Sequence, residues 1–162
     1  MHSALVPIIH HALAGHDLGD VFFNASCAGG GLFGAGKKVE VYLGGKLFTA
    51  YIYPDNMEKQ SLYPIMTASG KFITRGYPLN PRPFERTDHP HHVGLWFNFG
   101  SVNGLDFWNN SFAIKPEDKP KYGTIKFRKI VSENPAKGAL VTNADWVDVK
   151  DNVLLNEEAT YI

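Results

Sequence analysis

The sequence predicts an all-β protein, built as an antiparallel β-sandwich. Aromatic residues make up 13% of the 162 residues, and the chain holds 16 glycines and 10 prolines. Aromatic residues favour strands, whereas glycine and proline favour the turns between them. Several short runs alternate apolar and polar residues, and beyond the amino-terminal segment none holds helical periodicity over three turns. Together these observations favour antiparallel sheets over helical or mixed architectures.

The amino-terminal segment, residues 1–36, shows no strand pattern. An apolar run from Leu5 to Leu13 suits a short helix, whereas residues 24–36 contain five glycines. Four histidines in this segment lack a regular spacing, which favours a loose terminus over a metal site. We therefore expect a poorly ordered segment over residues 1–36, followed by a β-sandwich domain over residues 37–162.

The domain is expected to begin with a β-hairpin. Val39 and Val41 start a run of alternating residues that ends at Gly44-Gly45, and alternation resumes over residues 47–53. Two alternating runs joined by a glycine pair are a strong hairpin signal. A short apolar piece follows at residues 62–66. Further strands are expected over residues 71–75, 124–128, 140–149 and 153–162.

Composition excludes several classes of protein. The 16 basic and 16 acidic residues balance, and no basic stripe is present, so a nucleic-acid partner is not expected. Cys27 is the single cysteine, which rules out an intrachain disulfide and a cysteine-based zinc site. No apolar run reaches about 18 residues, so no helical membrane span is expected. The sequence carries no clear secretory signal and leaves localisation open.

The most unusual chemistry lies between Arg82 and Trp108. Three of the seven histidines fall within residues 89–92, and two of the three tryptophans follow closely. Charged and imidazole groups are costly to bury without partners, so this mixture indicates a site rather than a packed core.

Residues 91–99 are predicted to form a strand that Gly100 ends. A period of two gives this strand an apolar face for the core, made of Val93, Leu95, Phe97 and Phe99. The opposite face carries His92, Gly94, Trp96 and Asn98. Imidazole, indole and amide groups suit a sugar, and Gly94 leaves room for close approach to the backbone. The alternative is that Trp96 belongs to the core and His92 caps a loop.

The run Asp88-His89-Pro90-His91-His92 allows three interpretations. Asp88 can orient an imidazole for acid–base work or substrate binding. His89 and His91 can instead join Asp88 as metal ligands. Adjacent residues in a loop that contains proline are expected to diverge, however, which counts against the metal site. In the third interpretation the histidines are structural and donate to backbone carbonyls.

A tight turn is expected at Asn103-Gly104, because both residues accept positive φ. Asp106 follows this turn, and its carboxylate either caps it or contributes to the site.

Several motifs resemble the DUF6807 family, also called the methane oxygenase PmoA family. The resemblance covers residues 38–162, and its central motifs are Glu85–His92, Gly94–Phe97 and Val102–Trp108. Tyr63-Pro64-Ile65 with Thr74-Arg75 match an earlier motif, and Trp146 with Glu157-Glu158 match a later one. Val93 stands where the family commonly has a basic residue, and residues 1–36 match nothing in it.

The resemblance implies a galactose-mutarotase-like supersandwich, a fold whose members often bind or transform carbohydrates. It also implies a domain that continues beyond residue 162, so this chain is expected to be an amino-terminal portion. An unpaired sheet edge is then expected to allow self-association. Many relatives look exported and come from carbohydrate-degrading bacteria.

Three functions therefore remain open: a carbohydrate-active protein, a metal-dependent oxygenase as the family label suggests, and a non-catalytic binding or structural module. We favour the first, with a small-molecule or oligosaccharide ligand, no cofactor and no metal. An acidic partner such as Glu157 or Glu158 would strengthen it. The expected catalytic residues are Asp88, His89 and His92. The expected substrate-binding residues are Arg75, Arg86, His91, Trp96, Asn98, Asn103 and Asp106.

Overall fold

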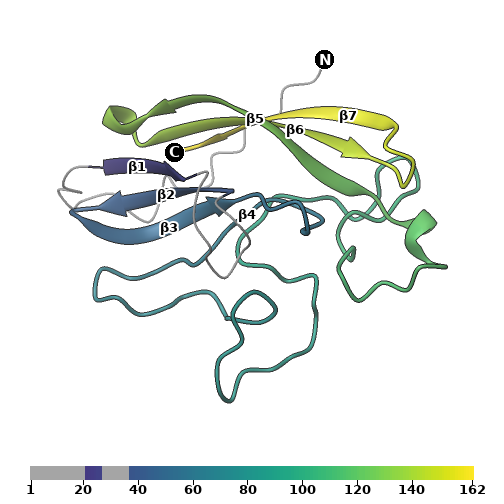
Figure 1. Cartoon of the computed structure of the whole chain (residues 1–162), viewed down its shortest axis with the longest axis horizontal. Helices are drawn as coiled ribbons and strands as arrows, with labels where there is room; N and C mark the ends of the chain where they lie inside the picture. The colour runs from purple at the N-terminus through teal and green to yellow at the C-terminus, as the bar shows by residue number, and fades with distance from the viewer. Residues whose placement is uncertain (1–20, 27–36) are drawn as a thin grey trace.

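The computed structural model describes residues 21–26 and 37–162, and it shows two antiparallel sheets that stack on each other (Figure 1). The two sheets confirm the predicted all-β sandwich. Helical structure in the described part is limited to two 3-10 turns, η1 (Lys119–Lys121) and η2 (Pro135–Lys137). The first sheet contains β1 (Val21–Ser26), β2 (Lys38–Leu43), β3 (Lys46–Ile52) and β4 (Ser61–Leu62), in that order. The second contains β5 (Thr124–Asn134), β6 (Ala139–Val147) and β7 (Val153–Tyr161), also in order.

The β2–β3 hairpin forms as predicted. Gly44 and Gly45 both take positive φ, 54° and 73°, which a two-residue turn between twisted strands requires. β1 pairs with β2 and adds a strand that the sequence analysis missed, because its short apolar run adjoins a glycine-rich stretch. The helix expected over residues 5–13 lies outside the described residues.

The core between the sheets follows from the alternation along β6. Leu140, Thr142, Ala144 and Trp146 are buried, and the residues between them are only partly buried. Leu140 packs with Val39, Tyr51 and Leu62 of the first sheet, so this cluster joins the two layers. Burying apolar surface between the layers supplies the main driving force for this arrangement.

A second core cluster ties the long connection between β4 and β5 to the second sheet. Phe107 of this connection is 1% exposed, and its ring centroid lies 4.8 Å from that of Trp146. Gly123 lies against the Phe107 ring, where any Cβ atom would overlap it. This contact fixes the connection that carries the histidines.

Much of that connection is irregular, and two expected strands in it are wrong. Residues 71–75 contribute only an isolated bridge between Phe72 and Met66. Residues 91–99 contribute only a bridge between Leu95 and Leu62 of β4. The later strands are confirmed as β5, β6 and β7.

β7 forms an edge of the second sheet. β7 pairs only with β6 among the described strands, and Val153 on β7 is 48% exposed. Self-association through this edge stays a prediction.

In the described part of the chain, no helix is long and apolar enough to cross a membrane.

A partly buried carboxylate lies in the second sheet. Glu157 of β7 accepts a hydrogen bond of 2.8 Å from Nε1 of Trp146. Burial raises the pKa of Glu157, and the hydrogen bond from Trp146 offsets only part of that rise. The folded state therefore holds this proton more tightly than the unfolded chain does, and stability falls as pH rises above the unfolded pKa of about 4.3.

Glu157→Gln is expected to raise the melting temperature at pH 8 relative to wild type. The amide oxygen can still accept from Trp146, while the ionisation that opposes folding is removed. At pH 3 the two proteins should melt at nearly the same temperature, because below the unfolded pKa of about 4.3 the carboxyl is protonated in both the folded and the unfolded state. Thermal melting across this range checks the result. Glu158→Gln, at an exposed neighbouring position, is the control and should show no comparable gain.

Candidate functional site

A turn at His89–His92 gathers the three clustered histidines. The backbone N–H of His92 donates to the carbonyl oxygen of His89 over 3.0 Å, with Pro90 in the first central position of the turn. The ring centroid of His92 lies 5.0 Å from that of His89 and 4.4 Å from that of His91. The expectation that these residues diverge is therefore wrong, because the turn folds the chain back on itself.

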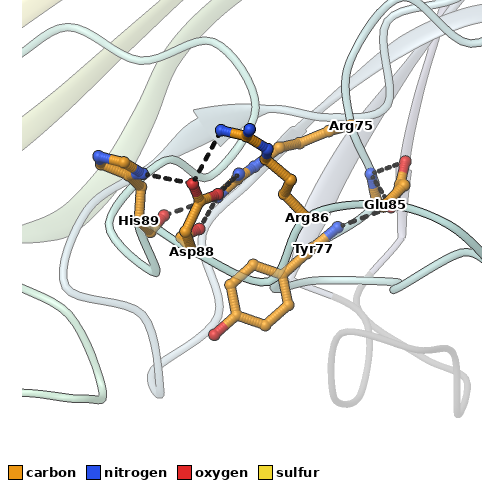
Figure 2. Close-up of polar contacts among 7 residues, drawn as sticks. Arg75, Tyr77, Glu85, Arg86, Asp88 and His89 are labelled. Carbon is orange, nitrogen blue, oxygen red and sulfur yellow. Dashed lines mark hydrogen bonds and ion pairs between the residues drawn. The ribbon is translucent and has the colours of Figure 1, made fainter.

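Arg75 holds this turn from outside. Its Nη1 donates to Oδ1 of Asp88 over 3.1 Å. Its Nη2 donates to the carbonyl oxygens of Asp88 and His89 over 2.6 and 2.7 Å (Figure 2). The guanidinium thereby fixes both the Asp88 side chain and the backbone of His89, whose φ is 50°. Few non-glycine residues adopt positive φ without such support.

Asp88 and His89 form a carboxylate–imidazole pair. Nδ1 of His89 lies 3.2 Å from Oδ2 of Asp88, and the imidazole is 57% exposed. Desolvation acts to raise the pKa of Asp88, but hydrogen bonds from Arg75 and His89 outweigh it, and the net pKa is lowered. Arg86 adds a looser contact of 3.8 Å to Oδ2, and its side chain is 89% exposed. Asp88 is therefore ionised at neutral pH and orients the His89 ring.

Glu85 anchors the segment that carries this pair. Its carboxylate accepts hydrogen bonds from the backbone N–H groups of Gly76, Tyr77 and Arg82. It also accepts from Nε of Arg82 over 2.8 Å. The Gly76 N–H and the Arg82 donors lower the pKa of Glu85 to about 2. Gly76 has to be glycine, because a Cβ atom there would collide with the carbonyl oxygen of Asn80.

Acidification is expected to loosen this segment before the strands unfold. The folded pKa of Glu85 lies below the unfolded value, so its contribution is present above about pH 4.3 and is lost as pH falls towards 2. Amide exchange of Gly76 and Tyr77 should accelerate over that range. Glu85→Gln should show fast exchange already at pH 6. Glu117→Gln, at an exposed position, should leave both amides protected.

The segment after the turn attaches to β4 rather than forming a strand of its own. Leu95 exchanges two backbone hydrogen bonds with Leu62, of 2.8 and 3.1 Å. Gly94 has a φ of 81°, and a Cβ atom there would lie 2.6 Å from the carbonyl oxygen of Leu62. The close approach that Gly94 allows is therefore made by the protein's own backbone. A sheet alternation cannot continue through this positive φ.

The predicted apolar face is consequently wrong in two of its four members. Val93 is buried, and Phe97 is partly buried against the Phe107 and Trp146 cluster. Leu95 and Phe99 are 38% and 60% exposed.

Trp96 nevertheless lies beside His92, as predicted. Its ring centroid is 5.5 Å from that of His92 and 5.3 Å from that of Trp108. With His89 beyond His92, four rings follow one another. We call this set the aromatic row: His89, His92, Trp96 and Trp108. Trp108 is 40% exposed and forms the open end of the row.

Lys59 is a residue of this site that the sequence analysis missed. It precedes β4, is only 3% exposed, and its Nζ lies 5.4 Å from the centroid of the Trp96 ring. Nζ donates to the carbonyl oxygen of Trp108 over 2.7 Å. No sequence signal marks it, since lysines are almost never buried and this one stands in a polar run.

The two inner histidines are neutral at physiological pH. Burial lowers the pKa of His91 to about 4, with further lowering from His92 and Lys59. Burial also lowers the pKa of His92, assisted by His89, Arg75 and Lys59. A neutral imidazole offers one donor and one acceptor nitrogen, which suits a hydroxyl group.

Three further expected substrate-binding residues lie in the segment after Trp96, and their role in binding stays a prediction. Asn98 donates to the carbonyl oxygen of Phe107 over 2.9 Å and accepts from the N–H of Phe99 over 2.7 Å. Asp106 accepts from the N–H and side-chain amide of Asn109 over 2.9 and 2.7 Å, although its charge still acts on His91. Asn103 stands in the predicted tight turn, with a φ of 51°.

Glu157 and Glu158, the acidic residues that would strengthen the first function as partners of the histidines, contact other residues. Glu157 bonds to Trp146, and Glu158 lies 3.3 Å from the side-chain amide of Asn143. The described residues also contain no group of three His, Cys, Asp or Glu side chains arranged to hold a metal ion. Asp88 is thus the carboxylate that the structure brings to the cluster.

Comparison with known proteins gives one match. The model of a family of unknown function, DUF6807, matches residues 38–162, a range that includes β2 to β7 and every residue of the candidate site. No curated protein and no solved structure matches.

Proposed function

The chain belongs to the DUF6807 family, and we propose that its aromatic row and the adjoining Asp88–His89 pair form a carbohydrate site. The observation that carries the proposal is the continuity of the row. Adjacent ring centroids are 5.0, 5.5 and 5.3 Å apart from His89 to Trp108. Indole rings offer apolar faces for a sugar ring, and neutral imidazoles offer hydrogen bonds to its hydroxyls.

The Asp88–His89 pair supports acid–base chemistry on the bound sugar. Asp88 contacts Nδ1 of His89, so Nε2 of this exposed imidazole is available for proton transfer. His92, stacked on His89 at 5.0 Å, is the second candidate acid or base. Proton transfer at a sugar hydroxyl or at the ring oxygen is the simplest reaction that these groups serve. The proposal rests on these contacts and not on the mutarotase-like architecture, which stays a prediction.

Trp108→Ala is expected to weaken saccharide binding by about tenfold or more. The substitution removes a partly exposed ring from the open end of the row, and a stacked aromatic contact contributes about 0.5–1.5 kcal/mol beyond the area it buries. Binding to a panel of neutral and acidic oligosaccharides, measured by calorimetry, checks the result. Phe99→Ala is the matched control, because this ring is 60% exposed and lies outside the row.

The same panel separates an enzyme from a binding module. Saccharides that bind are followed by NMR in D2O for accelerated interconversion of the anomers, which His89→Gln should abolish even for a saccharide that the variant still binds. If no saccharide in the panel binds to the wild-type protein, the carbohydrate proposal is wrong.

A further inference from the structure

Lys59 is a buried cation without a nearby anion. Its side chain is almost fully buried, yet no ion pair within 4.0 Å joins its Nζ to a described carboxylate. The carbonyl oxygen of Trp108, at 2.7 Å, takes one of its three N–H donors. The face of the Trp96 ring, 5.4 Å from Nζ, adds a cation–π contact. Buried charges are ordinarily paired, so this arrangement is incomplete.

Two carboxylates, those of Glu58 and Asp106, attract Lys59 but make their direct contacts with other residues. Glu58 pairs with Lys119 at 3.5 Å, and Asp106 accepts two hydrogen bonds from Asn109. Both act on Lys59 only through longer-range attraction, which does not offset the effect of burial. His91 and His92 also face this charge and are neutral at physiological pH. Lys59 therefore has no carboxylate in direct contact among the described residues.

A second, independent observation concerns the Trp96 indole. Its Nε1–H is buried and makes no hydrogen bond within the described part of the chain. A buried donor without an acceptor is costly, and native structures contain few of them. An unsatisfied N–H donor thus lies on the same ring whose face is next to the unpaired ammonium group.

We propose that the ligand of this site is an acidic saccharide, whose anionic group accepts from Nε1 of Trp96 and is attracted by Lys59. This inference rests on the proposed carbohydrate function and specifies its substrate class. A carboxylate or a sulfate group supplies the same chemistry. The anion does not have to reach Nζ, because Coulomb attraction acts over several ångströms and is weakly screened away from bulk water.

The test measures binding of matched saccharides to the full 162-residue chain. A galacturonic acid trisaccharide and a sulfated galactose oligosaccharide are compared with a neutral galactose trisaccharide. Wild type should bind one of the acidic ligands at least about tenfold more tightly than the neutral one, the effect of one charge-assisted hydrogen bond. Preference for the uronate or for the sulfate identifies which anion the site takes.

Lys59→Met and Trp96→Phe test the two groups separately. Lys59→Met removes the charge but keeps an unbranched side chain, and Trp96→Phe removes the N–H but keeps a ring. Each should reduce the preference for the acidic over the neutral ligand, taken as the ratio of the two affinities, by about tenfold. If Lys59→Met does not fold, as judged by its thermal melt, Trp96→Phe carries the test alone.

The acidic preference should also decline as pH rises through about 8, where Lys59 loses its proton. A structural lysine would not produce this change in selectivity. Equal binding of neutral and acidic ligands by wild type overturns the inference and leaves the carbohydrate function standing. Retention of the preference in both variants overturns it as well. Absence of all saccharide binding overturns both.

Discussion

Phe107→Ala is expected to reduce the free energy of unfolding by about 3–5 kcal/mol. Phe107 is 1% exposed, lies 4.8 Å from Trp146 between ring centroids, and packs with Ile125 and Ala144 of the second sheet. Removing its ring leaves a cavity in a cluster that the surrounding strands cannot readily close. Thermal melting should show a decrease of at least about 6 °C for a chain of this size.

Phe112→Ala provides the matched control for Phe107→Ala. Phe112 belongs to the same connection but is 62% exposed, so its loss should change stability by no more than about 0.5 kcal/mol. Equal melting temperatures for the two variants would show that Phe107 is not part of the core. Gly123→Ala should destabilise in the same direction as Phe107→Ala, because the added methyl group overlaps the Phe107 ring.

Arg75→Met is expected to weaken saccharide binding by about 10–100-fold, with a much smaller effect on folding. Arg75 donates three hydrogen bonds, to the Asp88 carboxylate and to two backbone carbonyls of the histidine turn. Hydrogen bonds to charged groups are worth about 1.5–3 kcal/mol, and here that energy holds His89 in a positive-φ conformation. Calorimetric titration with a saccharide that binds wild type measures the loss.

Arg86→Met is the control for charge alone. Arg86 also approaches Asp88, but its contact is 3.8 Å long and its side chain is 89% exposed. Its loss should change affinity by less than about threefold, since exposed ion pairs contribute little. If Arg86→Met and Arg75→Met reduce binding equally, net charge matters and the Arg75 hydrogen bonds do not.

The strands could be predicted from sequence because their patterns are local. The β2–β3 hairpin follows from two alternating runs and a glycine pair, and β6 follows from alternation that burial in the structure reproduces. β1 was missed because its apolar residues adjoin a glycine-rich stretch. The strand expected over residues 91–99 failed at Gly94, whose positive φ is imposed by the approach of Leu62, a contact distant in sequence.

The sequence indicates which residues lie together in the candidate site, but it does not predict the contacts that position them. Asp88, the three histidines and Trp96 do lie together, and the motif that contains them indicated this. Asn98 is predicted to bind a sugar from its place in the sequence, and only the structure shows that its amide donates to the carbonyl oxygen of Phe107. Tertiary contacts decide such roles, and no local pattern reports them.

Lys59 is the clearest case of a site residue that no local sequence pattern predicts. Its neighbours Glu58 and Gln60 give no sign that the side chain between them is buried. Only its contacts with the Trp96 ring and with the carbonyl oxygen of Trp108 make it part of the site. A buried residue that lies against the face of an aromatic ring, as Lys59 does, can therefore be identified only from the structure.

The most direct test of the carbohydrate site is an NMR titration that observes the side chains of the aromatic row. Imidazole and indole resonances are recorded while the panel of neutral and acidic oligosaccharides is added. We predict that a saccharide that binds shifts the signals of His89, His92 and the Trp96 indole N–H, and leaves Trp146, 2% exposed in the core, unchanged. Binding that leaves the row unshifted and perturbs residues elsewhere would contradict the proposed site.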